Sequence, residues 1–173
     1  ALAGDLIDFV RNLPTRRTTC IVLTSTHGFD LDAKDEILTL SEPVLHVPLM
    51  IHVPGRGRET RADLVSLEDV APTLALIVEV EVPRGIDGRH FINGSNGNRP
   101  IAAWGDPPTL TIRSDEWRYT WASPGAEPAG PTGLFRESSR AGWWKADTAA
   151  RDKQRVRRYQ EELETYLERQ RRR

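Results

Sequence analysis

The residues best placed to do chemistry stand in one short segment, Thr24-Ser25-Thr26-His27-Gly28, directly after the apolar run Cys20-Ile21-Val22-Leu23. A short β-branched run bounded by turn residues predicts a buried strand. Open α/β sheets place their binding sites at the carboxyl ends of such strands. His27 is therefore a candidate metal or anion contact, although a lone histidine beside a glycine is more often an ordinary turn residue.

Other groups could bind ligands, but each has a simpler structural role. An acidic loop after Gly28 could reach a cation, yet such loops are usually just solvated; its members are Asp30, Asp32, Asp35 and Glu36. Three further histidines are expected to be structural: His46, His52 and His90. Five tryptophans could form a sugar platform, but such residues more often pack a small sheet against helices: Trp104, Trp117, Trp121, Trp143 and Trp144.

Composition bounds the class of protein. The 173 residues suit one domain with a sizeable core. The 24 basic and 25 acidic residues nearly cancel, which argues against nucleic-acid binding through bulk charge. The single cysteine, Cys20, excludes an internal disulfide framework and a cysteine zinc cluster, and is expected to be a packed small hydrophobe. We expect no membrane span, and no signal peptide pattern is visible, so the compartment stays open.

The segments that must position His27 read as α/β. Residues 2–13 predict a helix ended by Pro14, and residues 47–53 a second strand. A helix followed by a continuous apolar strand favours a parallel sheet. Ser66 begins a capping-box pattern, and Pro72 must lie in the first turn of the following helix, which favours Asp69 as its N-cap.

The C-terminal half predicts a small antiparallel unit. Residues 110–113 and 117–121 look like two antiparallel strands around a turn. The last segment predicts a long helix whose apolar stripe is Val156, Tyr159, Leu163, Tyr166 and Leu167. Residues 145–173 hold ten basic and six acidic side chains, which we interpret as a solvated helix end.

The order of these segments resembles the C-terminal part of a sulfatase, within the alkaline phosphatase superfamily. Residues 24–28 look like the family's Thr-Ser-Asp-His-Gly, and residues 46–51 are similar to its Arg-Val-Pro-Leu strand, preceded here by Ser41-Glu42 where the family has Tyr-Glu. Residues 65–74 match its Ser-Leu-x-Asp-Leu-x-Pro-Thr-Leu helix. Further segments resemble its later elements: residues 80–83, 86–89, 112–119 and 133–135.

The resemblance implies a formylglycine nucleophile, made in the family from a Cys-x-Pro-x-Arg motif, and a calcium ion, or sometimes magnesium or manganese. Carboxylate and amide oxygens suit such hard cations. Here Cys20 is followed by Ile21-Val22-Leu23, so the formylglycine motif is absent from these residues, as is the family's N-terminal Asp pair. Thr26 stands where the resemblance places the metal-binding Asp, and Ile37 aligns with the sulfate-binding Lys, with Lys34 close by.

The predicted fold is α/β: a partial alkaline-phosphatase-like parallel sheet with helices, then a small antiparallel sheet and a long terminal helix. Residues 1–92 would be the C-terminal part of the catalytic domain, and residues 93–173 the C-terminal subdomain. By resemblance His27 and Thr26 are the metal ligands, calcium (or magnesium or manganese) is the family's cofactor although doubtful here, and no catalytic residue is assigned.

By resemblance the function is sulfuric ester hydrolysis, and we expect the chain to be inactive alone because it lacks the nucleophile motif. One alternative is a non-catalytic interaction or structural module derived from a sulfatase. Another is part of a phosphodiesterase or phosphonate hydrolase of the same superfamily. Expected partners are a sulfate ester in the full enzyme and either a second copy or an N-terminal half, with no nucleic acid and no membrane.

Overall fold

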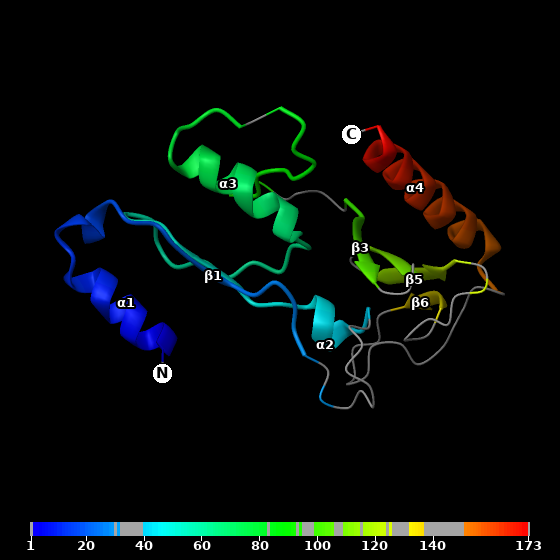
Figure 1. Ribbon diagram of the computed structural model, residues 1–173, viewed down its shortest axis with the longest axis horizontal. Coiled ribbons are helices and arrows are strands. Elements are labelled where there is room, and N and C mark those ends of the chain that lie inside the picture. Colours follow the sequence, from blue (N-terminus) through cyan, green and yellow to red (C-terminus); the bar gives the residue numbers. More distant parts are fainter. Residues whose placement is uncertain are drawn as a thin grey trace.

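The computed structural model describes residues 2–29, 31, 40–82, 84–92, 94, 99–105, 109–114, 116–123, 125, 132–136 and 151–172. Its elements run along the chain as follows (Figure 1): α1 Leu2–Asn12, η1 Pro14–Arg17, β1 Ile21–Thr24, α2 Glu42–Leu45, β2 Leu49–His52, η2 Leu67–Asp69, α3 Val70–Ile77, β3 Ile101–Gly105, β4 Thr109–Arg113, β5 Trp117–Ala122, β6 Gly133–Arg136 and α4 Lys153–Arg171. The predicted α/β class is confirmed. None of the described helices is both long enough and apolar enough to cross a membrane.

The first two strands form an antiparallel pair, and the expected parallel pairing is wrong for them. β1 pairs with β2 in a register that sets Thr24 opposite Leu49. The chain that leaves β1 at Thr24 therefore re-enters at the same end of the pair, whereas a parallel neighbour needs a crossover to the opposite end. The apolar run at residues 20–23 predicted the strand, but the expected burial is wrong, because Ile21 and Val22 are only half-buried and Leu23 is 36% exposed. Such a run also carries no information about the direction of the neighbouring strand.

The first helix forms as predicted, but its apolar stripe faces solvent. α1 ends at Asn12 and Pro14 opens the next short helix. Leu2, Leu6 and Phe9 are 91%, 59% and 61% exposed, and no residue of α1 is buried. The helical spacing of apolar residues thus predicted the element correctly, while no element of the described chain covers the stripe.

The C-terminal half is a four-stranded antiparallel sheet with the order β3-β4-β5-β6. The predicted hairpin, β4–β5, and the final helix are both confirmed, and β3 is an additional edge strand. α4 packs on one face of the sheet (Figure 1), where the core of the protein lies. Its buried members are Leu110, Ile112, Tyr119, Leu134, Tyr159 and Leu163. Trp117 and Trp121 pack against this core as expected, whereas Trp104 is 52% exposed.

The other face of the same sheet carries arginines. The register aligns Arg113 with Arg118 and Arg118 with Phe135 across three strands. Because side chains alternate along a strand, this row lies opposite the core row of Ile112 and Tyr119. Arg118 and Phe135 are only 2% and 3% exposed, and residues 40–45 contact this face, as described below.

The helix after Ser66 begins with a short 3-10 turn. Ser66 is the capping residue: its Oγ accepts from the Glu68 amide, and the side chain of Asp69 accepts from the Ser66 amide. Asp69 precedes α3 but makes no side-chain cap on it. The capping-box prediction is therefore confirmed, and so is Asp69 as the N-cap residue of α3, although its carboxylate bonds elsewhere.

Candidate functional site

The strand-end segment, residues 24–28, leaves β1 at Thr24 as predicted, and it orients His27 through the backbone. The Ser25 hydroxyl donates to the His27 carbonyl at 2.5 Å, and His27 Nδ1 lies 2.8 Å from the Gly28 carbonyl oxygen. A carbonyl only accepts, so this contact requires the proton of the neutral ring on Nδ1. Nε2 is then left with its lone pair, the arrangement common in histidines that bind a metal.

Gly28 fixes the segment against α2. Its amide donates to the Val44 carbonyl at 2.7 Å. A Cβ at this position would lie 1.9 Å from the Pro43 carbonyl oxygen, so the two backbones approach too closely for any side chain. The glycine of the His-Gly pair is therefore required by packing, and the backbone beside His27 is held to residues 43 and 44.

The described residues at the strand end do not by themselves fit a calcium ion. His27 and the neighbouring Thr26 are both exposed, and they offer one neutral nitrogen and one neutral hydroxyl. Calcium takes six to eight oxygen ligands, mostly charged or carbonyl. No group of three or more His, Cys, Asp or Glu side chains in the described part of the chain could hold a metal. The remaining predicted contacts fall outside the described residues: Asp30, Asp32, Lys34, Asp35, Glu36 and Ile37.

The short helix α2 is itself held by the arginine face of the C-terminal sheet. Glu42, 6% exposed, accepts from Arg113 Nη1 through Oε1 at 2.6 Å. Arg118 Nη1 donates to the Leu40 carbonyl at 2.6 Å. Burial lowers the pKa of Arg118 to about 10, while the nearby Glu42 carboxylate favours its charged form. His46 Nδ1 is 3.5 Å from the same Glu42 oxygen, which gives this exposed histidine a structural contact.

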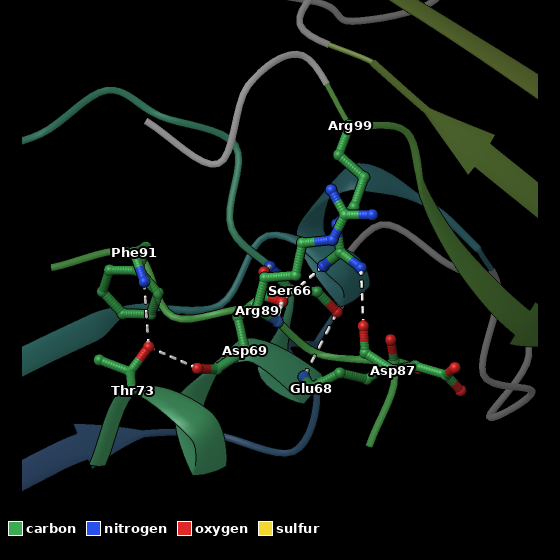
Figure 2. Close-up of polar contacts among 8 residues, drawn as sticks. All are labelled: Ser66, Glu68, Asp69, Thr73, Asp87, Arg89, Phe91 and Arg99. Carbon is green, nitrogen blue, oxygen red and sulfur yellow. Dashed lines mark hydrogen bonds and ion pairs between the residues drawn. The ribbon is translucent and has the colours of Figure 1, made fainter. Parts of the chain in front are cut away.

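A second buried polar cluster surrounds Asp69 (Figure 2), whose side chain is fully buried. One carboxylate oxygen accepts from the Arg89 amide at 2.7 Å and from Arg99 Nη2 at 2.5 Å, and the other accepts from the Ser66 amide at 3.0 Å. The Thr73 hydroxyl donates to the Asp69 carbonyl at 2.6 Å and accepts from the Phe91 amide. This cluster fastens Arg89, Phe91 and Arg99 to the start of α3.

The segment at residues 87–89 needs its glycine for the same kind of close approach. A Cβ on Gly88 would lie 1.8 Å from the Glu68 carbonyl oxygen. Asp87 meets the last helix, because Gln170 Nε2 donates to Asp87 Oδ2 at 3.1 Å, and its carbonyl accepts from Arg99 Nη1. The Asp-Gly-Arg sequence is thus a structural junction among η2, α4 and the strand that follows Arg99.

The sequence pattern indicates a role for His27 but none for Glu42, Arg113 or Arg118. All three lie in segments that carry the family resemblance, so the signal was present, but pairing residues 71 positions apart requires the tertiary structure. His52 and His90 are exposed and belong to no metal-type group among the described residues.

Comparison with known proteins shows what the chain is similar to. No protein-family model matches the chain. The chain is 27% identical to arylsulfatase K of Bos taurus over an alignment of 146 positions that covers 73% of this chain. Its sequence is therefore similar to that of a sulfatase. A second relative, arylsulfatase K of Canis lupus familiaris, is 29% identical over 91 residues, 51% of this chain. This chain spans 27% and 17% of the lengths of these two proteins.

Solved structures show the same fold. A Bacteroides thetaiotaomicron protein assigned to the sulfatases superposes with a TM-score of 0.76 at 16% identity, covering 97% of this chain and 40% of that one. The structure of BT4656 in complex with its substrate D-glucosamine-2-N,6-O-disulfate gives a TM-score of 0.53 at 20% identity, covering 95% and 36%. This chain therefore corresponds to a portion of each of these two folds.

Proposed function

We propose that this chain is the C-terminal portion of a sulfuric ester hydrolase and that His27 faces the sulfate ester site. Residues 1–92 then belong to the catalytic domain and residues 93–173 to the C-terminal subdomain. The observation that carries the proposal is the geometry of the strand-end segment: Nδ1 of His27 is held by the Gly28 carbonyl, so Nε2 is available at the end of β1. The relationship to two arylsulfatases supplies the reaction class.

In this proposal the chain binds and orients but does not supply the nucleophile. Neutral His27 accepts at Nε2 and, once protonated, donates a charge-assisted hydrogen bond to a sulfate oxygen. Gly28 keeps that ring in place through its contact with α2. The carboxylates that a hard cation needs, and the nucleophile, would come from residues other than those described.

The experiment is an NMR titration of the 173-residue chain, carrying labelled histidines, with an aryl sulfate. We expect the ring signals of His27 to shift, because the ring faces the ester site. The ring signals of His52, which is exposed in β2, should stay in place and serve as the matched control. Signals of His27 and His52 that move equally little at saturation would contradict the proposal.

A turnover assay accompanies the titration. With an aryl sulfate and calcium we expect only the background rate of hydrolysis from the chain alone, because the sequence contains no Cys-x-Pro-x-Arg motif. Turnover that disappears in a His27→Ala variant would show that the chain is a complete enzyme, and the assignment as a portion would be wrong.

A second candidate function is a non-catalytic module derived from a sulfatase. The observation that favours it is Thr26, a neutral hydroxyl where the family resemblance places a charged metal ligand. A calcium titration by calorimetry separates the two candidates. Stoichiometric, tight calcium binding supports a working hydrolase site, and an absence of binding together with unmoved His27 signals supports the module.

A further inference from the structure

Two like charges face each other on the buried side of the β4–β5 hairpin. Arg113 and Arg118 are register partners, so their side chains leave the same face of the sheet. Arg118 is 2% exposed and the side chain of Arg113 is 16% exposed. Like charges directly opposite each other destabilise a strand pair, and the effect is larger where water is excluded. This face therefore requires a negative charge close to both guanidinium groups.

Glu42 provides that charge from a distant part of the chain. Its side chain is 7% exposed, and its Oε1 lies 2.6 Å from Arg113 Nη1. Arg118 fixes the preceding backbone through its bond to the Leu40 carbonyl. The Leu40 side chain also closes on β3, because a Cβ on Gly105 would lie 2.8 Å from Leu40 Cγ. The beginning of α2 is thus fastened to the C-terminal sheet at three points.

The other side of α2 holds the strand-end segment. The Val44 carbonyl accepts from the Gly28 amide, and the Pro43 carbonyl lies against the Gly28 Cα. A continuous series of short contacts therefore runs from the arginine pair to Glu42, along one turn of α2, to Gly28 and its neighbour His27. In Figure 1, α2 lies between the β1 region and the four-stranded sheet.

We propose that Glu42, held by Arg113, is a positioning residue for the strand-end segment, so that the C-terminal sheet sets the orientation of His27. The role of His27 in this inference rests on the proposed function. The contacts from Arg113 through Glu42 to Gly28 do not depend on that function. Disruption of the Glu42–Arg113 pair should weaken the Gly28–Val44 backbone hydrogen bond more than the hydrogen bonds within the four-stranded sheet.

The test measures amide hydrogen exchange by NMR in Glu42→Gln, which keeps the size of the side chain and removes its charge. We expect the Gly28 amide to exchange roughly tenfold faster or more relative to the amides of β4 and β5, because a local opening then requires less free energy. The matched control is Arg136→Gln, which removes an exposed arginine 3.6 Å from Glu116 on the same sheet. It should leave Gly28 unchanged.

Two further variants keep the test decisive. Arg113→Lys retains the charge but loses the planar fork, so it should accelerate exchange at Gly28 less than Glu42→Gln does. The charge exchange Glu42→Arg with Arg113→Glu restores opposite charges and should recover part of the protection. If every amide accelerates equally, or Gly28 keeps its protection in Glu42→Gln, the positioning role is wrong. Amide exchange is measured without a ligand. If the aryl sulfate titration shows no binding, the exchange result still tests the positioning role of Glu42.

Discussion

Replacement of Asp69 by Asn isolates the contribution of one buried charge. The carboxylate is fully buried and accepts from Arg99 and from two backbone amides, those of Ser66 and Arg89. Asn has the same size but only one accepting oxygen, and its amide group would face donors. Removal of one partner of a buried ion pair costs about 3–5 kcal/mol. Since one oxygen remains to accept, we expect the free energy of unfolding to fall by about 3 kcal/mol.

The assay is urea unfolding followed by circular dichroism. With a slope of about 2 kcal/mol per molar urea, a loss of about 3 kcal/mol lowers the midpoint by about 1.5 M. The matched control is Asp8→Asn, because Asp8 pairs with Arg11 at 3.3 Å on the exposed face of α1, and such pairs contribute about 0–1 kcal/mol. A loss of less than about 1 kcal/mol for Asp69→Asn, close to that of the control, would refute the reasoning that Arg99 depends on this charge.

Two other outcomes follow from the packing. Gly88→Ala places a Cβ 1.8 Å from the Glu68 carbonyl oxygen. The free energy of unfolding, measured by thermal denaturation, should therefore fall by about 2 kcal/mol or more. In the control Gly57→Ala, whose Cβ would meet no atom within 4 Å, it should hardly change. Burial raises the pKa of Tyr159 above its ordinary value of 10.0, and its hydroxyl contacts Ser114 at 2.6 Å. The folded state favours the neutral phenol. Tyr159 therefore contributes to the free energy of unfolding below pH 10.0, and this contribution is lost as the pH rises through the pKa of the folded state. In Tyr159→Phe the free energy of unfolding should decline less steeply with pH in this range. A decline as steep as in the unchanged protein would show that the buried Tyr159 hydroxyl is not its cause.

Much of the local structure could be predicted from sequence because it depends on neighbours in the chain. The helical spacing in residues 2–13, Pro14 as a stop and the capping box at Ser66 are all short-range features, and the structure confirms them. The apolar stripe of α4 also identified residues that are buried, since Tyr159 and Leu163 lie in the core. In these cases the spacing of apolar residues and the type of capping residue are enough to predict the element.

The features that the sequence did not reveal have one cause: they depend on partners that are distant in the chain. The direction of β2 relative to β1 depends on the path of residues 25–48, and no pattern inside either strand encodes that path. The sequence correctly places Asp69 at the start of α3, but it does not reveal that the carboxylate also meets Arg99, 30 residues later. In each case a local pattern left several partners possible, and only the folded chain selected one.

The sequence by itself determined most of the elements, the likeness to sulfatases and the place of His27 after a strand, because each of these depends on neighbouring residues or on the order of short motifs. The tertiary structure alone decided which backbone holds His27, which carboxylate lies between two arginines, and which apolar stripe stays uncovered. The physical reason is that burial and ion pairing depend on what arrives from elsewhere in the chain. Glu42 is a surface-type residue by composition, and it is buried because Arg113 and Arg118 on a distant hairpin require its charge.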